Sequence, residues 1–300
     1  MKTGTLVDLD RPFDVVAQEM IDVSEHGISS AWVSQIFAMD ALTVLAAVAR
    51  EVPQIELGTA VVPVHPRHPF MLAAQALTVQ AISCGRLTLG VGLSHKPVIE
   101  TVFGGSFDRP VQYMKEYLSI LQPLLHEKEV AFVGERLKST TFGPIEVEAS
   151  APSVLLAAMG TAMLGLAGRA TDGTVTWMTG PATVRDHIIP TISASAMEAS
   201  RPSPRIVVGL PICVTHDVDQ ARDTAARSFR AYNRLPSYRA MLDREGAAGP
   251  ANVAIIGTAG AVRAQLLELA EFGATDFFGS PFGTLDERKA AFDVLASAGS

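Results

Sequence analysis

The sequence predicts an α/β protein whose parallel strands close into a (β/α)₈ TIM barrel. Strand-like apolar runs alternate with helical patterns along nearly the whole chain, as repeated β-α-β units do. The runs are almost unbroken, which strands covered on both faces require. Eight such strands fit within 300 residues, close to the roughly 250 of a barrel plus insertions. A doubly wound sheet needs a glycine-rich turn after its first strand, and DLDRPFD is no such turn.

Most of the predicted strands are followed by a predicted helix, and start and stop residues mark several of these helices. Gly27 stops the first helix, Asp40 can cap the second, and Pro53 ends it. The predicted strands cover residues 3–9, 31–33, 55–62, 86–93, 154–159, 174–178, 206–214 and 275–278. The predicted helices cover residues 12–25, 41–50, 70–82, 110–125, 161–170, 182–197, 218–242, 260–272 and 286–295.

Residues 127–150 interrupt this alternation. They are rich in charge and hold two short alternating runs, 130–133 and 145–147, around Gly134 and Gly143. This pattern predicts a hairpin inserted after the fourth helix. We therefore expect a single domain over residues 1–300 that contains this insertion.

Composition and charge exclude several classes of function. Hydrophobic residues make up 48% of the chain and charged residues 18%, which is typical of a soluble protein with a large core. The net charge is -7 and the longest basic cluster is HPRH at 65–68, so we expect no nucleic-acid partner. Cys84 and Cys213 lie far apart without metal-ligand spacing, so we expect neither a disulfide nor a metal site.

No segment predicts secretion or membrane insertion. Residues 1–9 are too short for the apolar core of a signal peptide. Residues 149–168 carry no charge over about 20 positions, but Pro152, Gly160 and Gly165 interrupt them. We expect a cytoplasmic protein whose partners are small molecules.

If the barrel closes, functional residues lie directly after its strands. Asp10 is the only carboxylate there in the first four loops before Glu100, which argues against paired-carboxylate hydrolysis and divalent-metal chemistry. The large, weakly polar side chains at these positions suit a flat organic ligand that carries the reaction itself. They are Phe37, Met159, Trp177, Met178 and Phe282, together with two histidines. A simple cap on the barrel core is the alternative.

Four stretches of the chain resemble one known family. They are IELGTAVVPVHPRHP, AQALTVQAISCGRLTLGVGLSHK, RPVQYMKEYLSILQPLL and LLAAMGTAMLGLAGRATDGTVTW. Together they are similar to the bacterial luciferase-like family, and most of all to its actinobacterial oxidoreductases that use the deazaflavin coenzyme F-420. The resemblance covers most of the chain. It implies a TIM barrel that binds a flavin or deazaflavin at its C-terminal rim and transfers a hydride at the ring.

The resemblance also implies where the cofactor binds. The family often has a non-prolyl cis peptide bond in its third strand, pressed against one face of the ring, which here falls at Ala60-Val61. Met159-Gly160-Thr161 matches the family's phosphate position, where a helix start offers free N–H groups. The implied cofactor contacts are Ala60, Val61, Val62, Ser94, Met159, Gly160, Thr161 and Trp177.

His95 is the implied catalytic residue, since related sugar-phosphate dehydrogenases carry a glutamate at this place after the fourth strand. An imidazole with a free pKa near ~6.5 can give or take the proton that accompanies a hydride. His65 and His68 are its rivals, but their stiff, basic loop suits a phosphate or an acidic cofactor tail better. The implied substrate pocket contains Gln35, Ile36, Lys96 and Phe282.

One departure from the family pattern bears on the reaction. Where the sugar-phosphate dehydrogenases have an Asp-His pair after the second strand, this chain has Gln35-Ile36 and lacks their base. That favours reduction of an activated C=C, C=N or C=O bond by the reduced deazaflavin. An FMN-dependent monooxygenase and a non-catalytic deazaflavin-binding relative remain as alternatives.

The resemblance implies a homodimer as well, because relatives often pair through the helices after the second and third strands. The run ALTVLAAVA at 41–49 is apolar enough to hide more than one face. A well-buried barrel helix would account for the same run.

Overall fold

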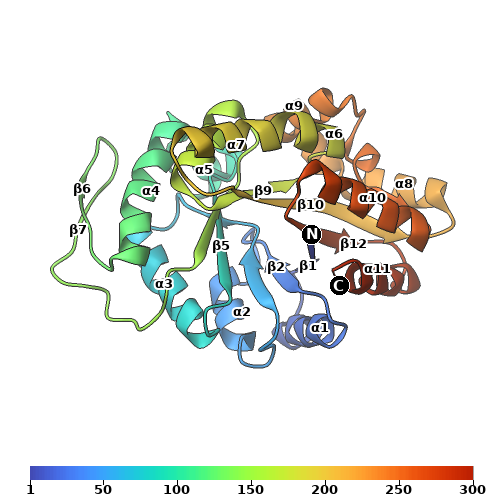
Figure 1. Cartoon of the computed structure of the whole chain (residues 1–300), viewed down its shortest axis with the longest axis horizontal. Helices are drawn as coiled ribbons and strands as arrows, with labels where there is room; N and C mark the ends of the chain where they lie inside the picture. The colour runs from blue at the N-terminus through green and yellow to red at the C-terminus, as the bar shows by residue number, and fades with distance from the viewer. Residues whose placement is uncertain (300) are drawn as a thin grey trace.

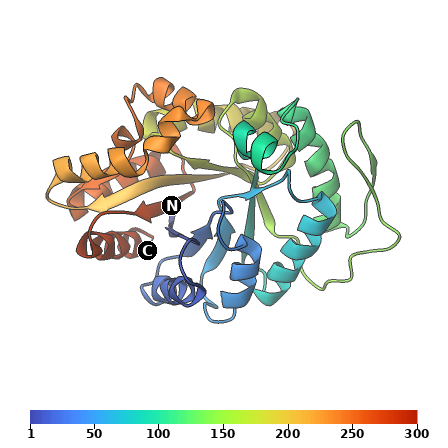
Figure 2. The same cartoon turned by 180° about the vertical axis from the view of Figure 1, so that it is seen from behind.

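The computed structural model describes residues 1–299, and the strands in this range close into a parallel barrel (Figures 1 and 2). Each barrel strand pairs with the next, and the last pairs with the first through Lys2 and Asp276. The predicted (β/α)₈ barrel is therefore confirmed. The eight barrel strands of this range are β1 Lys2–Val7, β2 Ser30–Val33, β3 Glu56–Thr59 continued by β4 Val62–Pro63, β5 Leu87–Gly92, β8 Ser153–Leu156, β9 Gly173–Trp177, β10 Arg205–Val214 and β12 Asp276–Pro281.

Helices surround the barrel and bury apolar side chains against it. In the first, Val16, Met20 and Val23 face the core. The predicted cap of the second is present, since the Asp40 side chain accepts a hydrogen bond from Thr43 N at 2.9 Å. The helices are α1 Phe13–Glu25, α2 Ala41–Val48, α3 Pro69–Ile82, α4 Pro110–His126, α5 Thr161–Ala170, α6 Pro181–Thr183, α7 Ile189–Glu198, α8 Val218–Ser228, α9 Pro236–Glu245, α10 Ala259–Phe272 and α11 Leu285–Ala298.

The segment after β10 differs from the prediction. Residues 218–242 were expected to form one helix, but α8 ends at Ser228 and α9 begins at Pro236 after a 3₁₀ turn, Arg230–Arg234. Proline has no N–H and clashes within a helix, so it starts a new one. A short strand that the sequence analysis missed, β11 Ile255–Gly257, extends the sheet beside the end of β10.

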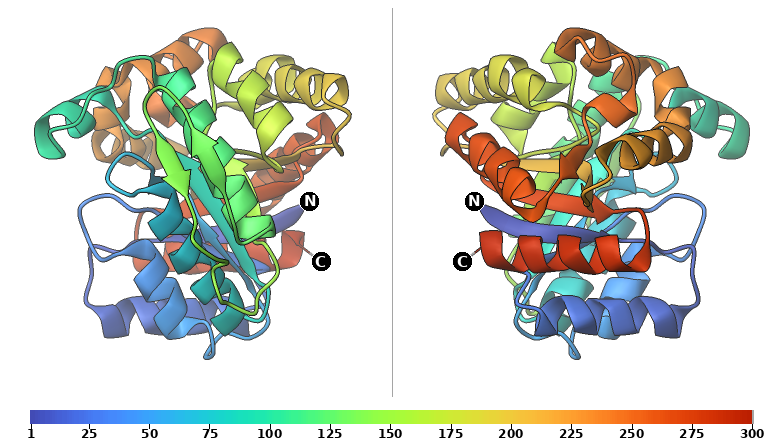
Figure 3. Two further views of the ribbon diagram at one scale, coloured as in Figure 1. Left: turned by 90° about the vertical axis from the view of Figure 1, so that its left-hand side faces the viewer. Right: turned by 90° about the vertical axis from the view of Figure 1, so that its right-hand side faces the viewer.

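The inserted hairpin is present, but its second strand was assigned wrongly. Strand β6 Ala131–Val133 pairs antiparallel with β7 Lys138–Thr140, whereas residues 145–147 lie outside both strands. The nearer segment pairs because a short turn at residues 134–137 joins it to β6. Figure 1 shows this hairpin outside α4, away from the barrel, and the left view of Figure 3 shows it in front of α4.

A buried carboxylate of α4 holds the turn of the hairpin. The Glu116 side chain accepts hydrogen bonds from the backbone N–H groups of Arg136 and Leu137, each at 2.9 Å, and of Glu135 at 3.2 Å. Burial raises its pKa, but the hydrogen bonds from Gln112 and from these N–H groups outweigh it and lower the pKa to about 2. The carboxylate therefore anchors the hairpin in its ionised form.

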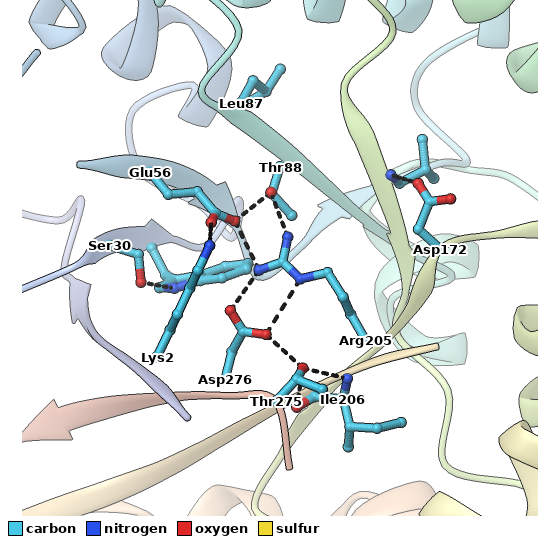
Figure 4. Close-up of polar contacts among 12 residues, drawn as sticks. Lys2, Ser30, Glu56, Leu87, Thr88, Asp172, Arg205, Ile206, Thr275 and Asp276 are labelled. Carbon is cyan, nitrogen blue, oxygen red and sulfur yellow. Dashed lines mark hydrogen bonds and ion pairs between the residues drawn. The ribbon is translucent and has the colours of Figure 1, made fainter. Parts of the chain in front are cut away.

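A charged network closes the N-terminal end of the barrel (Figure 4). The guanidinium of Arg205 lies 2.6 Å from Asp276 Oδ1 and 2.9 Å from Glu56 Oε1, and it donates to Thr88 Oγ1 at 3.1 Å. Lys2 adds a contact of 3.4 Å to Glu56. Because this end of such barrels serves stability, the functional site is to be sought at the opposite end.

The chain itself buries most of α2. Ala41, Leu42, Val44, Leu45 and Val48 are covered in the monomer, so α2 is a buried barrel helix and its apolar sequence gives no independent support for a dimer. Within residues 1–299 there is no helix long and apolar enough to cross a membrane.

Candidate active site at the barrel mouth

The C-terminal mouth of the barrel has an apolar floor. Ala60, Val61, Ala157 and Trp177 are half-buried, and they pack on a layer of fully covered side chains inside the barrel. We call these four residues the apolar shelf. The layer beneath them consists of Trp32, Leu155, Val175, Val207 and Phe278. A shelf of this kind leaves apolar surface exposed where a flat ring can bind.

A break in the third barrel strand forms one side of the shelf. The Ala60-Val61 peptide bond is cis, as predicted, and it separates β3 from β4. Ala60 N donates to Val33 O at 2.8 Å, and the Ser34 hydroxyl donates to Ala60 O at 2.6 Å. These bonds fix the break to the end of β2 and leave the Val61 side chain facing β5.

Two glycines of β5 make room for this break. A Cβ atom on Gly90 would lie 2.0 Å from Thr59 O, and one on Gly92 would lie 2.7 Å from a methyl carbon of Val61. Real Cβ atoms do not approach so closely, so the GVG sequence at the end of β5 is a packing requirement of the shelf.

A row of aromatic rings extends from the barrel interior to the shelf and along one side of the mouth. Phe278 stacks on Trp32 and on Trp177, with ring centroids 5.5 Å and 6.1 Å apart. Phe229 and Tyr232, from the segment between α8 and α9, meet Trp177 edge-on at 6.3 Å and 6.0 Å. Such edge-to-face contacts are favourable and leave little room for rotation.

His95 lies on the same side of the mouth. It follows β5 directly after Ser94, which adopts a left-handed backbone conformation with φ of 62°. Its ring centroid is 5.6 Å from that of Tyr238, and Tyr238 meets Tyr232 edge-on at 5.0 Å. Burial lowers the pKa of His95 below its usual 6.5, so the imidazole is neutral at pH 7.

The start of α5 is the predicted phosphate position. Gly160 precedes the helix, no side chain caps the first turn, and a Cβ on Gly160 would meet nothing within 4 Å. The N–H groups of the first turn are therefore open to an anion. His187 supports this loop from behind, because its Nε2 donates to Met159 O at 2.8 Å.

The structure places the predicted pocket residues in different surroundings. Gln35 is half-buried and its side-chain oxygen accepts from Ala41 N at 2.7 Å, whereas Ile36 is exposed. Lys96 is exposed and forms an ion pair of 3.8 Å with Glu100. Phe282 is buried in a separate cluster between β10, α8 and β11, where its ring meets that of Phe229 edge-on at 5.7 Å. Val62, a predicted cofactor contact, is fully covered within β4.

The side chains of His65, Arg67 and His68 in the HPRH loop already make contacts within the chain. His65 stacks on Tyr113 at 4.4 Å, and burial lowers its pKa. Arg67 pairs with Asp40, and the His68 side chain accepts from Phe70 N at the start of α3. This loop therefore keeps fewer free groups for an anion than its sequence suggests.

Sequence reasoning missed four contributors to the mouth. Tyr232 and Tyr238 were placed in a long helix, although Pro236 between them was a signal that the helix breaks. Glu245 accepts from Thr183 N at 2.7 Å and Ala182 N at 3.1 Å, and only the structure brings it there. Asp8 was placed inside a strand, but β1 ends at Val7 and leaves it on the rim.

Two hollows of the surface lie away from the mouth. One of about 360 Å³ is lined by Gln112, Glu116 and Phe132, and one of about 540 Å³ by His68, Met71 and Lys138, among others. Both flank the hairpin. They carry no convergent set of groups for catalysis, so the mouth remains the candidate site.

Comparison with known proteins gives the family to which this barrel belongs. The sequence profile of the luciferase-like monooxygenase family matches residues 17–276. The chain belongs to this family.

Individual relatives are similar over most of their length. A 5,10-methylenetetrahydromethanopterin reductase of Methanolobus tindarius is 27% identical over 288 residues, which cover 92% of this chain and 84% of the relative. The structure of the coenzyme F-420-dependent tetrahydromethanopterin reductase of Methanopyrus kandleri has a TM-score of 0.82 at 22% identity and covers 99% of this chain and 97% of that one. The oxygenating constituent of 3,6-diketocamphane monooxygenase of Pseudomonas putida, solved with FMN, has a TM-score of 0.78 at 16% identity and covers 99% and 96%.

Proposed function

We propose that this protein is a coenzyme F-420-dependent oxidoreductase that reduces an activated C=C, C=N or C=O bond of a small organic substrate. The observation that carries the proposal is the apolar shelf at the barrel mouth, which lies on the same rim as the uncapped start of α5. A flat ring fits the shelf and an acidic tail fits the helix start. The name of the Methanopyrus kandleri enzyme supports the deazaflavin.

The residues present fit such a cofactor. Ala60, Val61 and Ala157 would support one face of the ring, and Trp177 would border it. The open backbone at Gly160 would receive the phosphate, because a glycine lets the chain approach closely. When bound, the reduced deazaflavin supplies a hydride.

His95 would supply the accompanying proton. Its imidazole is half-buried at the mouth, and burial alone lowers its pKa. A neutral imidazole donates one N–H to a substrate oxygen or nitrogen, and it delivers a full proton once it takes one from water. Gln35 offers no base at this position, since its side-chain oxygen accepts a hydrogen bond from Ala41 N, so reduction is favoured over alcohol oxidation.

The direct test is a fluorescence titration of the purified protein with oxidised F-420 and, separately, with FMN. We expect coenzyme F-420 to bind at least tenfold more tightly than FMN. Tighter binding of FMN together with oxygen-dependent turnover would replace the proposal with an FMN-dependent monooxygenase. Tight F-420 binding without turnover over enones and imines would favour a non-catalytic relative.

We also propose that the protein is a cytoplasmic homodimer. The family resemblance supports the pairing. Two free cysteines, one exposed and one buried, are compatible with a reducing compartment. Light scattering coupled to gel filtration measures the mass, and a mass of 31.8 kDa would contradict the dimer.

A further inference from the structure

We propose that the outer face of the inserted hairpin and the groove beside it form the contact between two copies of this chain. The inference names the surface of the proposed homodimer and rests on that proposal, whereas the barrel mouth plays no part in it. Its basis is a projecting aromatic side chain next to an open groove of opposite charge.

The hairpin is attached to the barrel through one of its two faces. Ala131 is opposite Thr140 and Val133 is opposite Lys138, so these four side chains share a face, and all four are exposed, Val133 to 82%. Phe132 belongs to the other face, where it is half-buried against the core. A two-stranded ribbon is marginally stable by itself in water, so a cover on the outer face would stabilise it.

An open groove of about 540 Å³ lies between this outer face and the start of α3. Its apolar lining includes Met71, which is 57% exposed, as well as Val133. The volume lies in the range of small-ligand pockets, so the groove has room for an aromatic side chain. The lining residues are His68, Phe70, Met71, Val133, Lys138, Ser139 and Thr140.

Phe142 projects from the chain close to this groove. It follows the end of β7 at Thr140, its side chain is fully exposed, and it is not among the residues that line the groove. Figure 1 shows the hairpin and the segment after it outside the ring of helices. An apolar side chain of this size, beside other exposed apolar groups, marks a surface that binds a protein.

The charges of the groove and of the projecting segment are opposite. Lys138 lies in the groove, is exposed and forms no ion pair within residues 1–299. Glu146 and Glu148 follow Phe142, are exposed and are likewise unpaired within that range. Complementary charges fix the register of a contact, so the segment that carries Phe142 suits a groove that carries Lys138.

A second copy of the chain supplies both halves of this contact at once. In a two-fold symmetric dimer the same surface meets itself, so Phe142 of each copy enters the groove of the other. The two phenylalanines bury about 300–500 Å², whereas a stable interface needs about 1,200 Å² or more. The outer face of the hairpin and the start of α3 therefore belong to the interface as well.

The mass of the protein without cofactor tests this surface. Light scattering is expected to give twice 31.8 kDa for the wild type. Phe142→Asp and Val133→Asp are expected to raise the dimer Kd at least 100-fold, as loss of a central anchor does, and to keep the circular dichroism of a folded chain, because both side chains are exposed in the monomer.

Leu267→Asp is the matched control. Leu267 is 64% exposed on α10, which lies on the side of the molecule opposite the hairpin (Figure 1). This variant is expected to keep the dimer mass. If Phe142→Asp and Val133→Asp keep the dimer mass as well, the inference is wrong.

A cross-link tests the contact itself. With p-benzoylphenylalanine in place of Phe142, irradiation of mixed ¹⁴N- and ¹⁵N-labelled protein is expected to join position 142 of one copy to residues 68–71 or 133–140 of the other. Mass spectrometry of the peptides identifies the pairs. Cross-links confined to one copy, or to other surfaces, overturn the inference.

Charge reversal tests the role of Lys138. Lys138→Glu is expected to raise the dimer Kd about tenfold, because it places like charges together. Adding Glu146→Lys and Glu148→Lys to this variant is expected to restore the wild-type Kd. A triple variant that dimerises no better than Lys138→Glu contradicts the charge pairing.

The same measurements separate the levels of the proposal. If the wild type is a monomer, the proposed homodimer and this inference fail together. If the wild type is a dimer that Phe142→Asp does not weaken, the homodimer stands and the inference alone is wrong. The affinity of Phe142→Asp for F-420 is expected to equal that of the wild type, so the proposed oxidoreductase is tested independently.

Discussion

The imidazole ring of His95 lies 5.6 Å from the phenol ring of Tyr238, so the end of β5 meets the start of α9 at the barrel mouth. This contact covers His95 on one side. Burial is the cause of its lowered pKa, and no neighbouring charge offsets it. The start of α9 thus borders His95 on this side of the mouth.

Replacing His95 tests its role as proton donor. His95→Ala is expected to lower the kcat for enone reduction by about 10²-fold, because general acid catalysis contributes on that order. The affinity for coenzyme F-420 should change little, since His95 holds no part of the cofactor. His216→Ala, an exposed histidine after β10, is the matched control. Full turnover of His95→Ala would remove the residue from the mechanism.

The lowered pKa of His95 gives a pH dependence with a definite sign. Only the imidazolium carries a full proton for the substrate, and its fraction grows as the pH falls through and below 6.5. Reductive kcat/KM is therefore expected to rise toward acidic pH and to level off below pH 6.5. Stopped-flow oxidation of the reduced coenzyme measures this profile, and a profile that rises with increasing pH instead would point to a base.

Gly90→Ala tests whether the apolar shelf depends on the close approach of β5. The added Cβ would meet Thr59 O, and overpacking of this kind costs about 1–3 kcal/mol. We expect a lower free energy of unfolding, by about 2 kcal/mol, and cofactor binding weakened about tenfold. Gly143→Ala has open space around the new methyl group and should match the wild type in both measurements.

The hairpin is expected to loosen when Glu116 loses its charge. Its pKa lies below the ordinary value, so the stabilisation is fully present above about pH 4.5 and is lost as the pH falls toward 2. Hydrogen exchange at the amides of Arg136 and Leu137 follows this loss. In Glu116→Gln at neutral pH, trypsin should cleave after Arg136 roughly tenfold faster, as the loss of a charged hydrogen bond implies. Glu127→Gln, exposed at the end of α4, should cleave at the wild-type rate.

The barrel could be predicted from the sequence because unbroken apolar strands and helical stripes repeat along it. The break at Ala60-Val61 followed from the family resemblance. The positions of Tyr232 and Glu245 could not be predicted, since they depend on the bend before Pro236 and on the packing of α9 on α6. The predicted partner strand of β6 was wrong because residues 145–147 have an alternating pattern as well. Only the turn held by Glu116 decides that Lys138–Thr140 pairs with β6.

Anaerobic oxidation of reduced coenzyme F-420 by 4-phenylbut-3-en-2-one tests the central claim most directly. We expect the oxidised coenzyme to form in a one-to-one ratio with the saturated ketone, in the absence of oxygen and with no effect of added FMN. A protein that leaves the reduced coenzyme unchanged under these conditions, but consumes oxygen and the same ketone with reduced FMN, would contradict the account.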